Sequence, residues 1–294
     1  MSARTNEAAL RRQDLRQQWT LLGLLLPALA VILFVVLLPL AWLTYRSFIG
    51  ETGGFSVENY TRMVEYKSYA RVFAATFQVS FLTTAICILL GYPVAYCLAH
   101  VPPRWAPWLL LAVLLPCWTS LLVRTYAWLI LLQRNGIINE FGINTGLWDA
   151  PIQLLNGMTG TLIGMVHIML PFLILPLYGA IRRIDGDLLK AAASLGASPV
   201  ATFWRVVFPL SLPGLVAGVL IVFMLCLGFF ITPAILGGGR VILVSNQITA
   251  ILENQFDWGA ASALGVVLLV ATLAVLSLAA RLLSLDTFVF GRDR

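Results

Sequence analysis

The sequence has few charged and few metal-binding side chains. Asp, Glu, Lys and Arg make up 11% of its 294 residues, whereas soluble domains contain about 25%. Its two histidines, His100 and His167, are far apart and form no histidine pair at metal-ligand spacing. The four cysteines stand singly in apolar runs and form no CxxC pair: Cys87, Cys97, Cys117 and Cys226. These shortages argue against a metalloenzyme or a thiol redox protein.

Apolar sequence is abundant instead, with 60% hydrophobic residues and a mean hydropathy of +0.91. Six runs are long enough to supply the ~20 helical residues that cross a ~30 Å hydrocarbon core. They cover residues 17–45, 72–99, 105–133, 150–181, 206–239 and 258–280. In lipid a segment must satisfy its own backbone hydrogen bonds, so we expect six transmembrane helices. The first run is too long for the apolar region of a cleaved signal peptide, so we expect it to stay in the mature protein as a transmembrane helix.

The distribution of basic residues predicts the orientation of these helices. An even number of spans places both termini on one side, and that side carries most of the 19 Lys and Arg residues. By the positive-inside rule this side is the cytoplasm, so the basic charge reflects topology and indicates no nucleic-acid partner. We expect a cytoplasmic tail over residues 1–18, a six-helix transmembrane permease domain over 19–285 and a cytoplasmic tail over 286–294.

A small-residue stretch, DLLKAAASLGASPVATFWRVVFPLSLPG, separates the fourth and fifth spans at residues 187–214. Leu188, Ala192 and Leu195 recur with helical spacing, and the alanines favour a helix with little bulk. Gly196 predicts the end of that helix or a bend. The first half of the stretch is therefore expected to be a short helix that stops at the glycine.

The second half predicts another short helix. Ser198 and Pro199 have the types of an N-cap and a first helical residue, and Phe203 lies on the apolar side. Pro209 and Pro213 are expected to end this helix where the fifth span begins. The result is a helix–glycine–helix elbow on the membrane surface. It is either a plain amphipathic connector or a thin element onto which another protein docks.

The elbow resembles the EAA loop of binding-protein-dependent ABC importer permeases. That pattern is E-A-A, three residues, Gly, nine residues and I-x-L-P; this chain has Lys190-Ala191-Ala192, then Gly196, then Val206-Val207-Phe208-Pro209. Lys190 replaces the acidic residue, which puts in doubt any salt bridge that the usual Glu makes. Four further stretches look like the spermidine/putrescine-type subfamily: LLVRTYAWLILLQRNGIINEFG, LPFLILPLYGAIRRID, GFFITPAILGG and FDWGAASALG.

The resemblance implies an all-α type I ABC importer permease of the bacterial inner membrane, with the EAA loop between its fourth and fifth spans. It implies that a second homologous permease completes a heterodimer and that a periplasmic solute-binding protein delivers a small molecule. A cytoplasmic ATPase homodimer would bind ATP and Mg, leaving this chain without a cofactor or catalytic residue. The ATPase would contact Lys190, Ala191, Ala192, Leu195, Gly196, Ala197, Ser198, Pro199, Phe203 and Pro209.

Two polar residues inside spans are candidates for the translocation path. Arg124 lies in the third run, where an ion costs at least ~2.5–3.5 kcal/mol on insertion scales and so should face protein or water. It is either a pore or gate residue or a structural bridge. His167 lies in the middle of the fourth span, before Pro171. It is either a residue of the translocation path or a hydrogen-bonded core residue. Tyr126 and Trp128, near Arg124, are further path candidates.

The stretch GFFITPAILGGG supplies the remaining path candidates. We expect the helix to break near Pro233 and the unwound backbone to expose carbonyls to a cavity. Phe229 and Phe230 could then form an aromatic wall or gate, with Thr232 beside them. The alternative is a plain kink and helix end.

The substrate is less defined than the protein class. The resemblance indicates a polyamine or related amine, although no carboxylate lies deep in any span. Opines, aminoethylphosphonate-like compounds and other small organic solutes are the alternative. An ion-coupled secondary transporter is less favoured, since such proteins usually place ionisable groups near the midplane within repeats.

Overall fold

The structure is a computed structural model that describes residues 2–50 and 53–282, with backbone alone for residues 2–22, 24 and 282. Apart from an isolated bridge between Ile49 and Phe55, the secondary structure of this part is helical. The helices are α1 (Ser2–Ser47), α2 (Glu58–Glu65), α3 (Lys67–His100), α4 (Ala106–Trp118), α5 (Leu121–Leu132), α6 (Ile137–Asn144), α7 (Met158–Arg182), α8 (Gly186–Ser194), α9 (Pro199–Thr202), η1 (Phe203–Val207), α10 (Phe208–Leu227), α11 (Ile231–Leu236), α12 (Val244–Asn254) and α13 (Trp258–Leu282).

Five described helical segments are long and apolar enough to cross a membrane, and a bent pair makes a sixth. The bent pair is α4 with the segment Leu121–Asn144, and its two parts meet at 94°. Thr119 and Ser120 between them have extended backbone, with ψ of 150° and 136°. The six expected spans are therefore present when the pair counts as one, but the third is sharply bent.

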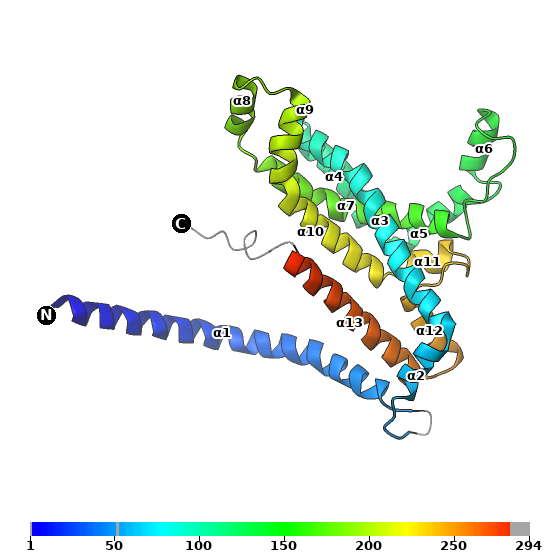
Figure 1. The fold of residues 1–294 in the computed structure, drawn as a ribbon, viewed down its shortest axis with the longest axis horizontal. Coiled ribbons are helices and arrows are strands. Elements are labelled where there is room, and N and C mark those ends of the chain that lie inside the picture. Colours follow the sequence, from blue (N-terminus) through cyan, green and yellow to red (C-terminus); the bar gives the residue numbers. More distant parts are fainter. Residues whose placement is uncertain (1, 51–52, 283–294) are drawn as a thin grey trace.

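Helix α7 forms the centre of the bundle and packs against α3 and α10 (Figure 1). Leu173, on α7, is fully buried and meets glycines on both neighbours. A Cβ on Gly91 of α3 would lie 2.6 Å from a Leu173 methyl, and one on Gly218 of α10 would lie 3.0 Å from the Leu173 carbonyl oxygen. Small residues thus bring three helices into close contact, as in other helical membrane proteins.

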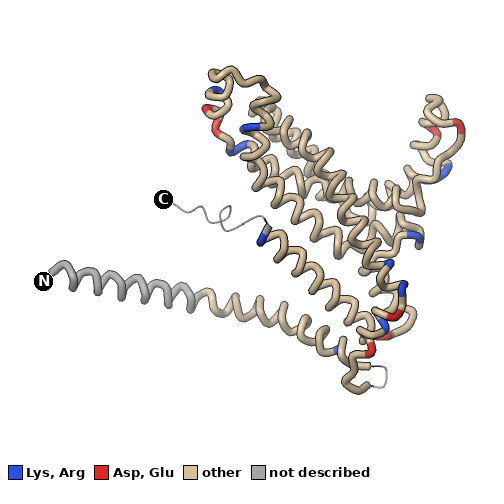
Figure 2. Tube along the Cα trace, in the orientation of Figure 1, with Lys and Arg blue, Asp and Glu red and all other residues tan. Residues whose placement is uncertain are grey.

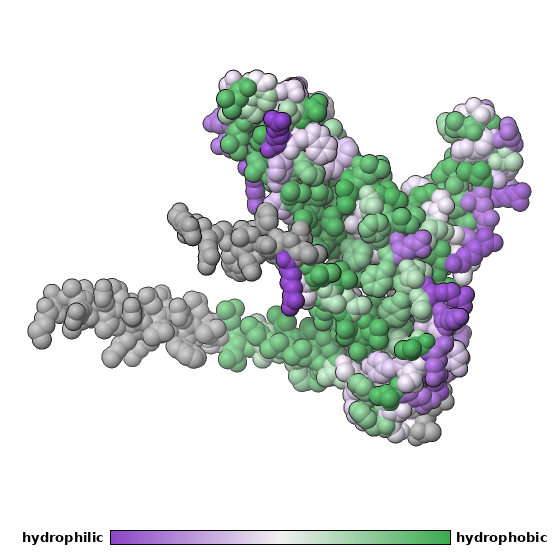
Figure 3. Space-filling view, in the orientation of Figure 1, coloured by the Kyte–Doolittle hydropathy of each residue, from purple (hydrophilic) through white to green (hydrophobic). Residues whose placement is uncertain are grey.

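Helix α1 lies apart from this bundle and contacts mainly α13 (Figure 1). Its candidate span, Leu25–Ser47, has a mean hydropathy of 2.7 and is 0% buried within the chain. Its described surface is almost uniformly apolar (Figure 3). The helix has an outer surface suited to lipid or to another apolar helix.

Charged residues gather at the ends of the helices and leave the middle of the bundle apolar (Figure 2). One end carries α8 and α9 and the other carries α2 and α12, whereas α6 projects as a separate arm beyond α5 (Figure 1). The predicted boundary between tail and first span at residue 18 falls inside α1, and the predicted tail over 286–294 lies outside the described residues.

Candidate functional site

The first half of the elbow is helix α8, and its two ends are capped as the residue types predict. At the N-terminus the Asp185 carboxylate accepts a hydrogen bond from the Asp187 N–H at 2.9 Å. At the C-terminus the N–H groups of Gly196 and Ala197 donate to the carbonyls of Ala193 and Ala192, both at 3.0 Å. This is a Schellman motif, and Gly196 takes the left-handed conformation it requires, with φ of +78°. The predicted stop at Gly196 is confirmed.

The second half begins as predicted but does not end where the prolines were expected to end it. Ser198 caps α9 by accepting from the Ala201 N–H at 3.3 Å, and Pro199 is the first helical residue. The chain then passes through the π-helical segment η1 directly into α10, with Pro209 in its first turn and Pro213 inside it. In an α-helix the Pro209 ring would meet the carbonyl of Arg205. The wider π turn just before Pro209 relieves that clash, so the helix continues.

The outer surface of the elbow presents apolar side chains to solvent. Leu195 is 89% exposed and Val200 is 67% exposed, at the two sides of the Gly196 bend. Lys190 forms an ion pair with Asp187 at 2.7 Å, and both side chains are about four-fifths exposed. Such an exposed pair contributes little to stability. The lysine that replaces the usual acid is therefore held within its own helix without being buried.

Phe203 connects the elbow to the bundle. Its ring makes edge contacts with Tyr92 and Tyr96 of α3, at centroid distances of 5.7 and 5.4 Å. It also lies 5.1 Å from Trp204 and 6.4 Å from Phe208. These rings pack the start of α10 against α3.

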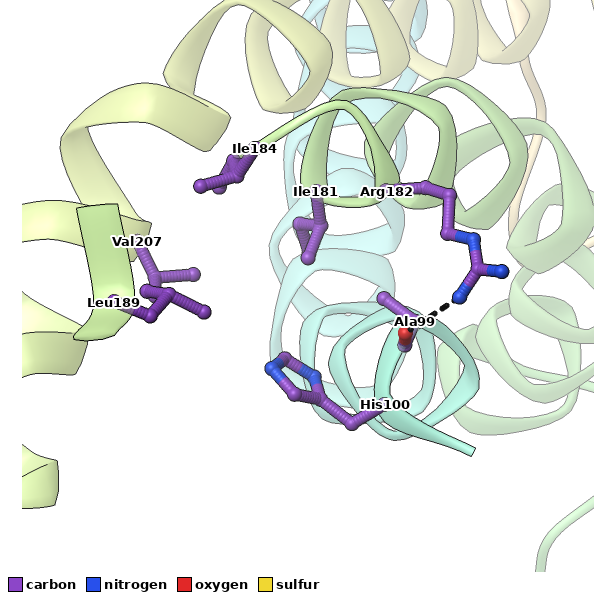
Figure 4. A pocket seen from close by; sticks show the side chains of 7 residues that line it. All are labelled: Ala99, His100, Ile181, Arg182, Ile184, Leu189 and Val207. Atoms are coloured by element: carbon purple, nitrogen blue, oxygen red, sulfur yellow. Dashed lines mark hydrogen bonds between the residues drawn. The ribbon is translucent and has the colours of Figure 1, made fainter. Parts of the chain in front are cut away.

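A small pocket lies beneath the elbow where α3, α7, α8 and η1 meet (Figure 4). Its volume is about 180 Å³. Arg182 extends from the end of α7 and donates to the Ala99 carbonyl at 3.3 Å. Leu189 of α8 and Val207 of η1 form the opposite wall. Sequence patterns do not predict this pocket, because its lining comes from four separate elements.

At the other end of α10 the helix breaks, but earlier than predicted. It ends at Leu227, and the break covers Gly228 to Phe230, whereas Pro233 lies inside α11. The Ser245 hydroxyl donates to the Phe229 carbonyl at 2.6 Å, and the Asn246 amide donates to the Phe230 carbonyl at 3.1 Å. Side chains of α12 therefore satisfy the carbonyls at these two positions, and exposure of backbone carbonyls to a cavity stays a prediction.

The candidate path residues of this region have different environments. Thr232 and Pro233 are buried, and the Thr232 hydroxyl lies 3.3 Å from that of Thr125 on α5. The Phe230 side chain is 38% exposed, and Phe229 packs against the central core. Phe230 is thus the most accessible of the four, and a role in the path stays a prediction for all of them.

The structure brings two of the candidates on α5 and α7 together. The Trp128 indole N–H donates to His167 Nδ1 at 3.1 Å, and the rings meet edge to face at 5.7 Å. Because Nδ1 accepts, the imidazole is held as its other tautomer, with the proton on Nε2. Both rings line an apolar pocket of about 490 Å³. Their contact could not be foreseen from residues 39 positions apart.

Arg124 lies one helical turn before Trp128 and is half-buried. Its Nε is buried and finds no hydrogen-bond partner among the described residues. Tyr126, on the same helix, is 53% exposed. The α5 segment therefore offers unused polar groups within a membrane span.

Residues 11–285 match the family described as binding-protein-dependent transport system inner membrane component. The chain belongs to this family. The permease is accordingly an all-α, multi-pass membrane component of an ABC import system, and its relatives are transport components rather than enzymes.

The permease is similar over most of its length to polyamine transport proteins. It is 38% identical to the spermidine/putrescine transport system permease protein PotB of Haemophilus influenzae, over 82% of this chain and 87% of that protein. It is 38% identical to PotB of Escherichia coli K12, over 71% of this chain and 77% of that protein. The putative 2-aminoethylphosphonate transport system permease protein PhnU of Salmonella typhimurium LT2 is 27% identical, over 88% and 90%.

Solved structures show that the permease shares its fold with ABC importers. A bacterial alginate ABC transporter, in complex with its pentasaccharide-bound periplasmic protein, matches with a TM-score of 0.74 at 17% identity, over 94% of this chain and 97% of that one. The MetNI methionine transporter matches with a TM-score of 0.54 at 18% identity, over 72% of this chain and 93% of that one.

In the described part of the permease, no three His, Cys, Asp or Glu side chains gather as a metal site.

Proposed function

We propose that the permease forms one half of the translocation path of an ATP-driven importer for a polyamine or a related amine. A cytoplasmic ATPase homodimer docks on residues 187–209. The observation that carries the proposal is the capped, outward-facing elbow, in a chain 38% identical to a spermidine/putrescine permease.

The exposed face of the elbow supports ATPase docking. Burial of a leucine side chain yields about 1.5–3 kcal/mol, and Leu195 is almost fully available for burial. The small side chains of Ala191 and Ala192 let a partner approach the α8 backbone. ATP and Mg would be bound by the ATPase, and the permease would respond through Phe203 and its contacts with α3 and α10.

A second permease and a periplasmic solute-binding protein would complete the importer. The unburied α1 span offers a surface for the second permease. With the elbow and both termini in the cytoplasm, α6 would lie on the periplasmic side. Its exposed Ile137 and Phe141 lie where a binding protein would dock.

The substrate class rests on the relatives. Polyamines are named for the PotB proteins, and 2-aminoethylphosphonate is named for PhnU. The second class gains support from Arg124, because its unpartnered donor is suited to an anionic group and not to a polyamine. A small aminophosphonate is therefore the alternative substrate.

The decisive experiment measures ATP hydrolysis by the complete transporter in nanodiscs, with its binding protein and a panel of putrescine, spermidine and 2-aminoethylphosphonate. Stimulation by one of the amines, only when the binding protein is present, is the expected result. Stimulation by the phosphonate alone would replace the polyamine assignment. A permease pair that fails to bind the ATPase would refute the coupling function.

A further inference from the structure

The pocket beneath the elbow lies at the level where helices leave the hydrocarbon. Its polar residues are the last residues of two candidate spans: His100 ends α3, and Arg182 ends α7. Val207, in its wall, directly precedes α10. Trp105, at the start of α4 nearby in the chain, is 56% exposed, as expected of an aromatic residue in the interfacial belt. The pocket is therefore at the depth of phospholipid headgroups.

The pocket combines a cation with apolar walls. Arg182 donates one hydrogen bond to the Ala99 carbonyl, and no carboxylate lies within 4.0 Å of it among the residues whose side chains the structure describes. A guanidinium presents five donors in a planar fork that fits phosphate oxygens, so most of its donors are free for a ligand. Ile181 lies next to it on α7, and Ile184 and Leu189 supply apolar surface on the opposite side of the pocket (Figure 4).

The volume and the fixed side chains also suit a ligand larger than water. About 180 Å³ is several times the roughly 30 Å³ that a water molecule occupies in the liquid. The His100 ring is held by a 2.8 Å bond between its Nδ1 and the Tyr96 carbonyl, and by a 4.2 Å centroid contact with the Tyr96 ring. The lining thus has an ordered polar side and an apolar side, which is the chemistry of an amphipathic anion.

We propose that this pocket binds the phosphate group of an anionic phospholipid from the cytoplasmic leaflet. That leaflet is rich in such lipids, and basic pockets between helices at this depth bind their headgroups. Because Leu189 belongs to α8 and Val207 to η1, the bound headgroup contacts the elbow from beneath. Lipid binding at this pocket depends on its lining and its place in the membrane, and not on the proposed coupling function. Its effect on ATP hydrolysis rests on the proposed coupling function.

The test compares Arg182→Gln with Arg183→Gln in the complete transporter. Arg183 is the next residue, is exposed and does not line the pocket, so its replacement removes the same charge without the contact. The transporter is placed in nanodiscs of phosphatidylcholine with or without phosphatidylglycerol, and native mass spectrometry counts the retained phosphatidylglycerol. We expect about fivefold weaker retention for Arg182→Gln and less than twofold for Arg183→Gln. Equal retention by the two variants would refute the site.

Two further arms keep the result unambiguous. Ala99→Leu narrows the pocket without a change of charge, and it should also lower retention; normal retention in this variant would contradict the proposal. Excess inorganic phosphate should leave the lipid bound, and displacement by phosphate would assign the pocket to a soluble anion instead. The mass-spectrometric readout does not need the ATPase, so it separates failure of this site from failure of the coupling function. Stimulation of ATP hydrolysis by phosphatidylglycerol, reduced in Arg182→Gln and Ala99→Leu but kept in Arg183→Gln, is expected if both hold.

Discussion

Replacement of Leu195 by alanine provides the sharpest test of the elbow as a docking surface. The side chain is 89% exposed in the permease, so its loss should leave the melting temperature of the permease unchanged. If the ATPase buries it, the change removes about three methyl or methylene groups from the interface, or about 2 kcal/mol. We therefore expect the affinity for the ATPase to fall roughly thirtyfold.

The assay is biolayer interferometry of the permease pair in nanodiscs against the purified ATPase. Leu147→Ala is the matched control, because Leu147 is 66% exposed and directly follows α6, in an arm of the chain far from α8 (Figure 1). Unchanged ATPase affinity in Leu195→Ala, or an equal loss in Leu147→Ala, would show that the exposed leucine of the elbow is not part of the interface.

Three other substitutions test how the structure is held together. Gly196→Ala forces a side chain into a φ of +78°, which costs roughly 1–2 kcal/mol. It should weaken ATPase binding while leaving the melting temperature of the permease nearly unchanged. ATPase affinity equal to that of the unaltered permease would argue against the elbow geometry. Gly214→Ala places a Cβ 2.6 Å from the Pro176 carbonyl oxygen and should destabilise the bundle by about 1–3 kcal/mol, whereas Gly179→Ala on α7 meets nothing within 4 Å and should be neutral in thermal unfolding. Ser245→Ala removes the donor to the Phe229 carbonyl and should cost about 0.6 kcal/mol and lower transport; an unchanged rate in proteoliposomes would show that the break needs no such support.

Sequence patterns predicted the features that depend on neighbouring residues. The apolar runs predicted the spans. Gly196 predicted the end of the first elbow helix, and Ser198 and Pro199 predicted the start of the second. Each of these depends on local backbone preference or on hydropathy.

Other features depend on residues that meet only in the folded chain. The carbonyls at the Gly228 break are satisfied by Ser245 and Asn246, which hydropathy cannot connect to them. The Trp128–His167 bond joins two helices, and the Arg182 pocket joins four elements. Pro209 does not end the helix because the chain makes a π turn just before it, whereas Pro213 lies inside α10.

The π turn at η1 also fixes the direction in which the elbow faces. A π turn holds one residue more than an α turn, as the bond from the Phe208 N–H to the Phe203 carbonyl shows. Each residue of an α-helix advances the chain by about 100° around the axis. Loss of a single codon in this segment would therefore swing α8 and α9 about a quarter of a revolution around the axis of α10. The bundle would be intact, but its docking face would point toward the wrong neighbour.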